Sequence, residues 1–159
     1  MVSSIRLVEI TQGTLQPVLG LAVAPAQARF VAPNAVSIAE AHFEPGAWFR
    51  AIESDGEPVG FALFFHNFST WTGRRGLYLE DLYVAPEARG RGVGRALLTH
   101  LARLAVARDC ARFEWSVLDW NADAIAFYRA LGAVGLDDWT VQRVTGEALR
   151  RLAGADGGR

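Results

Sequence analysis

A glycine-rich turn with closely spaced arginines is the segment of this sequence best suited to bind a ligand. It reads Arg89-Gly-Arg-Gly-Val-Gly94, with Arg95 next, and it lies between an apolar run and a helical pattern. Glycine permits positive φ angles and close approach of the backbone, and the first N–H groups of a helix lack partners within the helix. With the positive end of the helix dipole and the arginine side chains, these groups would bind an anion such as a pyrophosphate.

The spacing of these glycines excludes two common phosphate-binding loops. A dinucleotide-binding G-x-G-x-x-G loop would need glycine where this chain has Arg95, and a P-loop needs a lysine that the chain does not contain. The pattern that fits is Arg/Gln-x-x-Gly-x-Gly/Ala, from Arg89 to Gly94. On the hexamer alone, an ordinary strand-to-helix turn with solvated arginines stays open as an alternative.

Further motifs resemble a known family. The hexamer is similar to the coenzyme A loop of the GCN5-related N-acetyltransferase (GNAT) superfamily, and Asn-x-x-Ala-x-x-Phe-Tyr-x-x-x-Gly at 121–132 is similar to a second motif of that superfamily. Residues 59–153 resemble its diamine (spermidine/spermine) acetyltransferase branch, through Gly60-Phe-Ala, the loop around Trp71, Leu77-Tyr-Leu-Glu-Asp, Asp119-Trp-Asn and Trp139. Residues 1–58 resemble a second group of bacterial spermine/spermidine acetyltransferases, which raises the hypothesis of a chimera joined near Pro58.

The resemblance implies an acetyl-CoA-dependent enzyme that transfers an acetyl group to a primary amine by direct attack in a ternary complex, without a metal. Tyr128 would protonate the departing thiolate, and Glu80 would draw a proton from the amine through a water molecule. Main-chain groups near Leu82 and Val84 would bind the pantetheine arm and polarise the thioester. The residues expected to bind the cofactor are Leu82, Val84, Arg89, Gly90, Arg91, Gly92, Val93, Gly94, Arg95, Asn121 and Phe127.

Acidic and aromatic residues suggest how a cationic amine would be bound. Glu80 and Asp81 are adjacent on an expected strand, so their side chains should point to opposite faces and only one should line a given wall. Asp81 is expected to bind or orient the substrate. Aromatic faces attract ammonium groups, so a slot for a polyamine is expected from Asp119, Trp120, Asp138 and Trp139. The alternative is core tryptophans beside solvated acids, and Ser69-Thr70, where the diamine branch often has an acid, speaks against a long polyamine.

Composition narrows the classes of function. The chain has 159 residues with 17 acidic and 16 basic side chains, a net charge of −1, which argues against nucleic-acid binding through bulk positive charge. All basic residues are arginines, typical of a GC-rich bacterial genome, so a lysine Schiff base is excluded. One cysteine and 3 histidines give no disulfide and no metal-ligand spacing. The longest apolar run, Val59–Phe65, is too short to span a membrane, and without a signal peptide we expect a cytoplasmic protein.

Periodicity places these residues on an alternating set of elements. We expect strands near 5–11, 48–52, 58–66, 77–84 and 112–118, with a hairpin turn at Asp55-Gly56 and a polar loop over 67–76. Helices are expected after Thr11 as far as Ala22, from Ser37 as a cap to Phe43, from Val93 with Leu97, Leu101 and Leu104 on one face, from Asn121 as a cap to Leu131, and at 148–153. A last pair of strands is expected around Val134 and 139–144.

This order predicts an α+β protein with a mostly antiparallel sheet. The resemblance implies the GNAT fold, in which a mixed, mostly antiparallel central sheet is flanked by helices. We expect one domain over residues 1–153, a flexible tail at 154–159, and a homodimer by analogy with the family. Two other functions stay open. The chain could acetylate another small amine, such as a thialysine-like amino acid, an aminoglycoside or a peptide N-terminus, or it could bind coenzyme A or polyamines without turnover.

Overall fold

The computed structural model describes residues 5–23 and 32–155. The chain divides into two compact units, the first ending at Trp120 and the second beginning at Asn121. The elements of the first unit are β1 (Ile5–Glu9), α1 (Gln12–Leu19), α2 (Asn34–Phe43), β2 (Ala47–Ser54), β3 (Glu57–Ser69), β4 (Arg74–Val84), the short 3-10 helix η2 (Pro86–Ala88), α3 (Val93–Ala107) and β5 (Phe113–Trp115). The second unit contains α4 (Ala122–Arg129) and α5 (Gly146–Leu152).

The strands form one sheet in the order β1-β2-β3-β4-β5. β1 to β4 are antiparallel to their neighbours, and β5 runs parallel to β4. The expected turn at Asp55-Gly56 joins β2 to β3, and both residues adopt positive φ angles, as a tight hairpin turn requires. The expected mixed, mostly antiparallel sheet is therefore confirmed.

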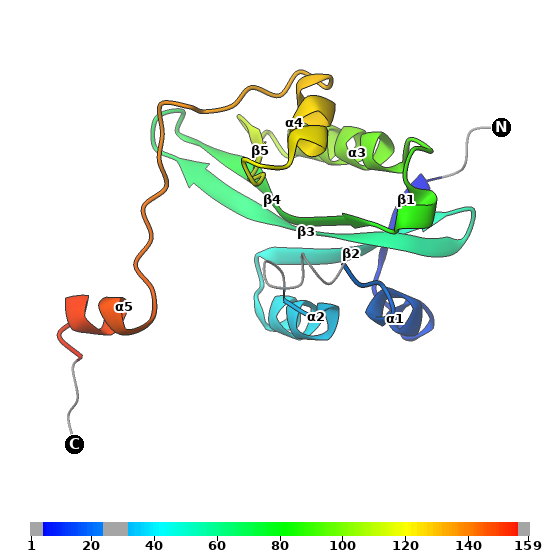
Figure 1. The fold of residues 1–159 in the computed structure, drawn as a ribbon, viewed down its shortest axis with the longest axis horizontal. Helices are drawn as coiled ribbons and strands as arrows, with labels where there is room; N and C mark the ends of the chain where they lie inside the picture. Colours follow the sequence, from blue (N-terminus) through cyan, green and yellow to red (C-terminus); the bar gives the residue numbers. More distant parts are fainter. Residues whose placement is uncertain (1–4, 24–31, 156–159) are drawn as a thin grey trace. The chain divides into compact units, whose positions relative to one another are not determined.

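Helices cover both faces of this sheet. In the first unit, α1 and α2 lie on one face and α3 lies on the other (Figure 1). On the first face, Val18 of α1 packs with an aromatic row in which Phe61 stacks against Phe49 and Tyr83 at ring-centroid distances of 5.2 and 5.5 Å. The Tyr83 hydroxyl donates a 2.6 Å hydrogen bond to the carbonyl oxygen of Ala22, which ties the chain after α1 to β4.

α3 packs through residues that recur every fourth position. Its buried residues are Val93, Leu97, Leu98, Leu101 and Ala105. The helical period places them on one face, which buries apolar surface against the sheet. Leu104, which we expected on this face, is only half-buried. The helix directly follows the glycine-rich turn, so its packing fixes where that turn lies.

Two element boundaries differ from the sequence prediction in ways that concern the site. α2 begins at Asn34, not at Ser37, because the carbonyl oxygen of Pro33 accepts the N–H groups of Val36 and Ser37. The Asn34 side chain donates to the carbonyl oxygens of Val18 and Leu21, which joins α2 to α1. Ser37 therefore lies inside the helix, where it is buried.

Most of the polar loop expected at 67–76 belongs to two strands. β3 and β4 pair as far as Ser69 and Arg74, so the turn is confined to 70–73 and includes Gly73 at a positive φ. Strands can carry polar residues where they extend into solvent. A search for patterns of apolar residues does not detect such parts of a strand. The first strand and α1 are shorter than expected, ending at Glu9 and Leu19.

The C-terminal part contains less strand than the sequence predicts. β5 has three residues instead of the seven expected at 112–118, and the strand pair expected around Val134 and 139–144 is not formed in the described residues. A strand needs a partner for its backbone groups, and within the second unit no other strand is described to supply one. Asn121 caps α4 as expected, with its Oδ1 accepting the N–H of Ala124 at 3.2 Å, and α4 ends at Arg129, ahead of Gly132 at φ +91°.

Candidate active site

A cavity of about 450 Å³ lies on the face of the sheet that α1 and α2 cover. This volume is within the range of small-molecule sites. Its walls come from α2 and the turn that follows it, from β2 and β3, and from the middle of β4. The lining residues are Ala32, Ser37, Glu40, Ala41, Glu44, Ala47, Leu63, Phe65, Glu80 and Asp81.

β4 has one residue more than β3 beside this cavity. Leu63 pairs with Asp81, and the next residue of β3, Phe64, pairs with Leu79, so Glu80 is the extra residue of a β-bulge. A bulge changes the direction of side chains on the strand that carries it, and bulges occur often next to active sites. As a result Glu80 and Asp81 both line the same cavity. The prediction that only one of these neighbours would line a given wall is therefore wrong.

The two adjacent carboxylates affect each other electrostatically. Asp81 is half-buried, and this burial, followed by the negative charge of Glu80, raises the pKa of Asp81 above its ordinary value. Glu80 is exposed. Neither carboxylate has an ion-pair or hydrogen-bond partner in the part of the chain that the structure describes. The pair can therefore attract a cationic amine and accept a proton from it.

β4 also separates from β5 next to this cavity. The two strands pair only from Leu77 to Leu79, and β5 ends at Trp115. Beyond that point the β4 residues Leu82 and Val84 pair with β3 on one side only, among the residues that the structure describes. Their edge toward β5 can therefore hydrogen-bond an extended ligand that carries amide groups.

The glycine-rich turn adopts the backbone that an anion-binding loop needs. Gly90 and Gly92 have φ angles of +71° and +84°, and apart from the adjacent residues no atom lies within 4 Å of the position that a Cβ would take at either residue. Gly92 is the N-cap of α3, and its carbonyl oxygen accepts the N–H of Ala96 at 2.9 Å. The backbone here is uncovered, so a phosphate group can approach it closely.

The side chains of the glycine-rich turn differ in how they could take part in binding an anionic ligand. The Arg89 guanidinium donates from Nε to the carbonyl oxygen of Val84 at 2.9 Å and lies 5.9 Å from the centre of the Tyr83 ring, so it holds the turn against β4. The side chain of Val93 is buried, which leaves only its backbone for a ligand. Arg91 and Arg95 are exposed and carry the positive charge of the loop.

The second unit holds Asn121, Phe127 and Tyr128. The rings of Phe127 and Tyr128 are in contact, with centroids 5.4 Å apart. Burial raises the pKa of the Tyr128 hydroxyl, so it keeps its proton at neutral pH and can donate it. Asp138 and Trp139 lie in the exposed segment between α4 and α5 that has no regular secondary structure.

The acidic–aromatic slot expected from the sequence does not line this cavity. Asp119 and Trp120 are exposed in the turn after β5 and are not among its lining residues, whereas Asp81, which was expected separately to bind or orient the substrate, does line it. Three residues that sequence reasoning missed do line it: Ser37, Glu40 and Glu44. Ser37 and Glu40 are three residues apart on α2, and Glu44 directly follows that helix. Ser37 was missed because it was interpreted as a cap.

Comparison with known proteins agrees with this architecture. A family model described as "Acetyltransferase (GNAT) family" matches residues 18–133. The chain belongs to this family. An integron cassette protein from the mobile metagenome of V. cholerae has the same GNAT fold, with a TM-score of 0.76 and 25% identity over 96% of this chain and 98% of that one.

Two curated relatives have named activities. A thialysine N-epsilon-acetyltransferase from Sus scrofa is 43% identical over 111 residues, which are 65% of this chain and 65% of that protein. A spermidine/spermine N(1)-acetyltransferase-like protein 1 from Homo sapiens is 35% identical over 98 residues, 60% of this chain and 14% of that protein. The chain thus spans less than two thirds of the length of these GNAT relatives.

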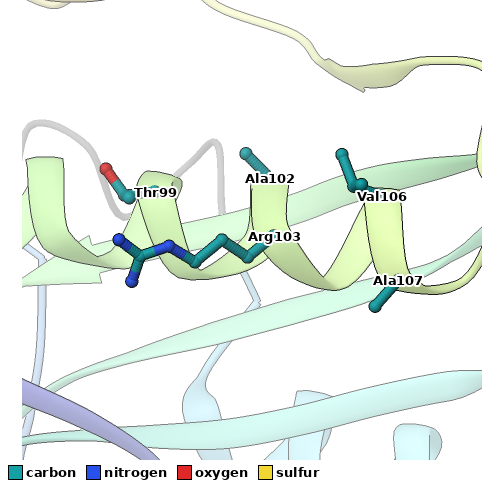
Figure 2. A pocket seen from close by; sticks show the side chains of 5 residues that line it. All are labelled: Thr99, Ala102, Arg103, Val106 and Ala107. Carbon is teal, nitrogen blue, oxygen red and sulfur yellow. The ribbon is translucent and has the colours of Figure 1, made fainter.

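No other described feature of the chain is as good a candidate for the functional site as this cavity. A second hollow, of about 390 Å³, lies along the exposed side of α3 and is lined by Thr99, Ala102, Arg103, Val106 and Ala107 (Figure 2). Its walls are mostly apolar, and Arg103 is its only ionisable group. Across the described ranges, no group of three or more histidine, cysteine or acidic residues could hold a metal ion. No helix within those ranges is both long enough and apolar enough to cross a membrane.

Proposed function

We propose that this chain is an acetyl-CoA-dependent N-acetyltransferase that acetylates a primary amine of a small, diamine-like substrate by direct attack in a ternary complex. The observation that carries the proposal is the bulge in β4, because it turns two carboxylates into one cavity beside the separated end of the same strand. Membership of the GNAT family and relatives named for amine acetylation support it.

The cofactor site fits the residues available. The uncovered backbone of Gly90 and Gly92, with Val93, Gly94 and the cations Arg91 and Arg95, would hold the pyrophosphate. The backbone of Leu82 and Val84 on the edge toward β5 would bind the pantetheine amides, with the Val84 carbonyl oxygen already accepting from Arg89. Asn121 and Phe127 would complete the contacts. Bound there, acetyl-CoA supplies the acetyl group as a thioester.

The chain's own residues would then handle two protons. An aliphatic amine has a pKa near 10 and arrives as an ammonium ion, so Glu80 would draw off a proton through a water molecule before the nitrogen attacks the thioester carbon. The carbon–sulfur bond breaks as the carbon–nitrogen bond forms. Tyr128 would give its proton to the leaving sulfur. The second proton that the nitrogen loses as the amide forms would return to the Tyr128 oxygen through water. Asp81, which lines the cavity, would bind the cationic substrate.

An amine panel with free-thiol detection tests this function. We expect thiol release with small diamines, and Glu80→Gln and Tyr128→Phe should each lower kcat by about 100-fold or more, the size typical of lost acid–base catalysis. Tyr78→Phe is the matched control, because the Tyr78 hydroxyl bonds to Ser116 at 2.8 Å outside the cavity. Unchanged transfer by Tyr128→Phe would overturn the role of Tyr128.

Thermal unfolding with acetyl-CoA tests the cofactor site separately. A ligand at 100 times its dissociation constant adds about 2.7 kcal/mol to the free energy of unfolding, so the Tm should rise by roughly 5–10 °C. Absence of any shift would contradict the cofactor site. Stabilisation without turnover on every amine would contradict catalysis and favour a non-catalytic coenzyme A-binding domain.

A further inference from the structure

A second group of ionisable side chains lies on the face of the sheet that α3 covers (Figure 1). Its centre is the Trp48 ring of β2, whose neighbour Phe49 packs with α1 on the opposite face. The guanidinium of Arg108, the C-cap residue of α3, lies over the Trp48 ring with its Cζ 4.3 Å from the ring centre. The His66 ring of β3 meets Trp48 edge-on at a centroid distance of 5.0 Å. Trp48 therefore brings together two side chains that do not line the cavity.

Two buried nitrogen atoms of this cluster lack partners. Nε2 of His66 and Nη1 of Arg108 have no hydrogen-bond partner among the described residues. Buried polar atoms are normally hydrogen-bonded, so an exception calls for an explanation such as a bound water or ion. Arginine nitrogens only donate, and both ring nitrogens of a protonated histidine donate as well. The two atoms therefore indicate a bound group that accepts hydrogen bonds.

β4 supplies a third cation beside the His66 ring. Leu77 of β4 pairs with His66, and Arg75 lies two residues before Leu77, on the same face of the strand. Burial, followed by the positive charges of Arg108 and Arg75, lowers the pKa of His66. A bound anion would offset these charges and raise that pKa.

In the described part of the chain, no carboxylate is paired with these cations. Asp109 directly follows Arg108, but it forms a 2.7 Å ion pair with Arg74. Neither Arg75 nor Arg108 takes part in an ion pair within the described ranges. Arg108 is half-buried, and charged groups that leave solvent normally have a partner of opposite charge. The cluster therefore favours an anion over a water molecule.

We propose that Arg108, His66 and Arg75 form a binding site for a small oxyanion, such as sulfate, phosphate or a carboxylate. The planar guanidinium of Arg108 offers parallel N–H donors to two oxygen atoms, and protonated His66 donates from Nε2. The cation–π contact with Trp48 holds the guanidinium in place. This site and the cavity lie on opposite faces of the sheet, so it is independent of the proposed function.

NMR titration of the histidine rings tests the proposal. The chain has 3 histidines, and the signal that His66→Gln removes is that of His66. At constant ionic strength, sulfate in place of chloride should raise the pKa of His66 by about 1, because a nearby opposite charge favours the protonated ring. Acetate is the arm for carboxylates, and the anion that gives the larger rise identifies the geometry of the site. The pKa of His100, which is exposed on α3, should be the same in all three salts.

Arg108→Gln tests which side chain holds the anion. In this variant the pKa of His66 should no longer respond to sulfate or acetate. Arg103→Gln is the matched control, because it changes an exposed arginine of the same helix and should keep the wild-type response. An equal pKa of His66 in all three salts would overturn the proposal, and so would a response that Arg108→Gln does not change. If Arg108→Gln does not fold, the wild-type comparison of His66 with His100 decides the question.

Discussion

The surroundings of Asp81 make the ionised form of its carboxyl group unfavourable. Burial and the neighbouring Glu80 raise its pKa, so the ionised form is less favourable in the folded chain than in the unfolded chain. Above this pKa the ionised carboxylate lowers the free energy of unfolding. We therefore expect Asp81→Asn to increase the free energy of unfolding at neutral pH by about 0.5 kcal/mol, while it weakens acetyl transfer. Urea unfolding measures the first effect.

The increase in the free energy of unfolding expected for Asp81→Asn depends on pH, and its pH dependence follows from the direction of the pKa shift of Asp81. As the pH falls through the pKa of Asp81 in the folded state, the wild-type side chain takes up a proton and its penalty disappears. The stabilities of wild type and Asp81→Asn should therefore converge at acidic pH. Glu57→Gln, which changes an exposed carboxylate at the start of β3, is the control for the loss of one negative charge. A variant that is less stable than wild type at neutral pH would contradict this account of Asp81.

At the scale of residues, the sequence identified both cavity carboxylates of β4 but not their orientation. Nothing in Tyr-Leu-Glu-Asp-Leu marks Glu80 as an extra residue, because the bulge exists only in the pairing of β4 with β3. Glu40 and Glu44 were missed for a different reason. They lie at the end of α2 and in the turn after it, and only the packing of this helix against β2 brings them to the cavity.

α3 connects the glycine-rich turn to the core of the first unit, so its packing can be tested by itself. Leu101 is completely buried, and Leu101→Ala should lower the free energy of unfolding by about 3 kcal/mol through lost burial and a residual cavity. Val106 lies on the same helix but is 79% exposed, and Val106→Ala should change the free energy of unfolding by less than about 0.5 kcal/mol. Equal effects in urea unfolding would contradict the described face of α3.

Elements with a strong apolar period were predictable, and elements defined by partners were not. The apolar face of α3 and the cap of α4 at Asn121 follow from local residues. The ends of β3 and β4 depend instead on backbone pairing between polar residues. Residues 139–144 have the composition of a strand, but strand propensity is context-dependent and does not create a partner.

At the scale of the molecule, the order of strands and helices predicted the α+β class, and the resemblance of two motifs implied the GNAT fold. The family match and the solved structure confirm both. Net charge was less informative. A value of −1 excludes a polycationic surface, but it averages over Arg89, Arg91 and Arg95 in the turn and the acids of the cavity. Each substrate would interact with the charges close to its own binding site, which the net charge of the chain does not describe.

Varying the ionic strength tests whether local charges, and not the net charge of the chain, attract the substrates. If the cavity acids attract a diamine and the turn attracts an anion, raising the ionic strength from about 0.1 M to about 1 M shortens the Debye length from about 10 to 3 Å and weakens both attractions. We expect KM for cadaverine and KM for acetyl-CoA each to rise several-fold, because Glu40, Glu44, Glu80, Arg91 and Arg95 are exposed to the screening ions. KM for pentylamine, which has one charge, should rise less than KM for cadaverine. Equal salt dependence for these two amines would show that the second ammonium group is not bound by charge, whereas the small net charge alone predicts no dependence for either substrate.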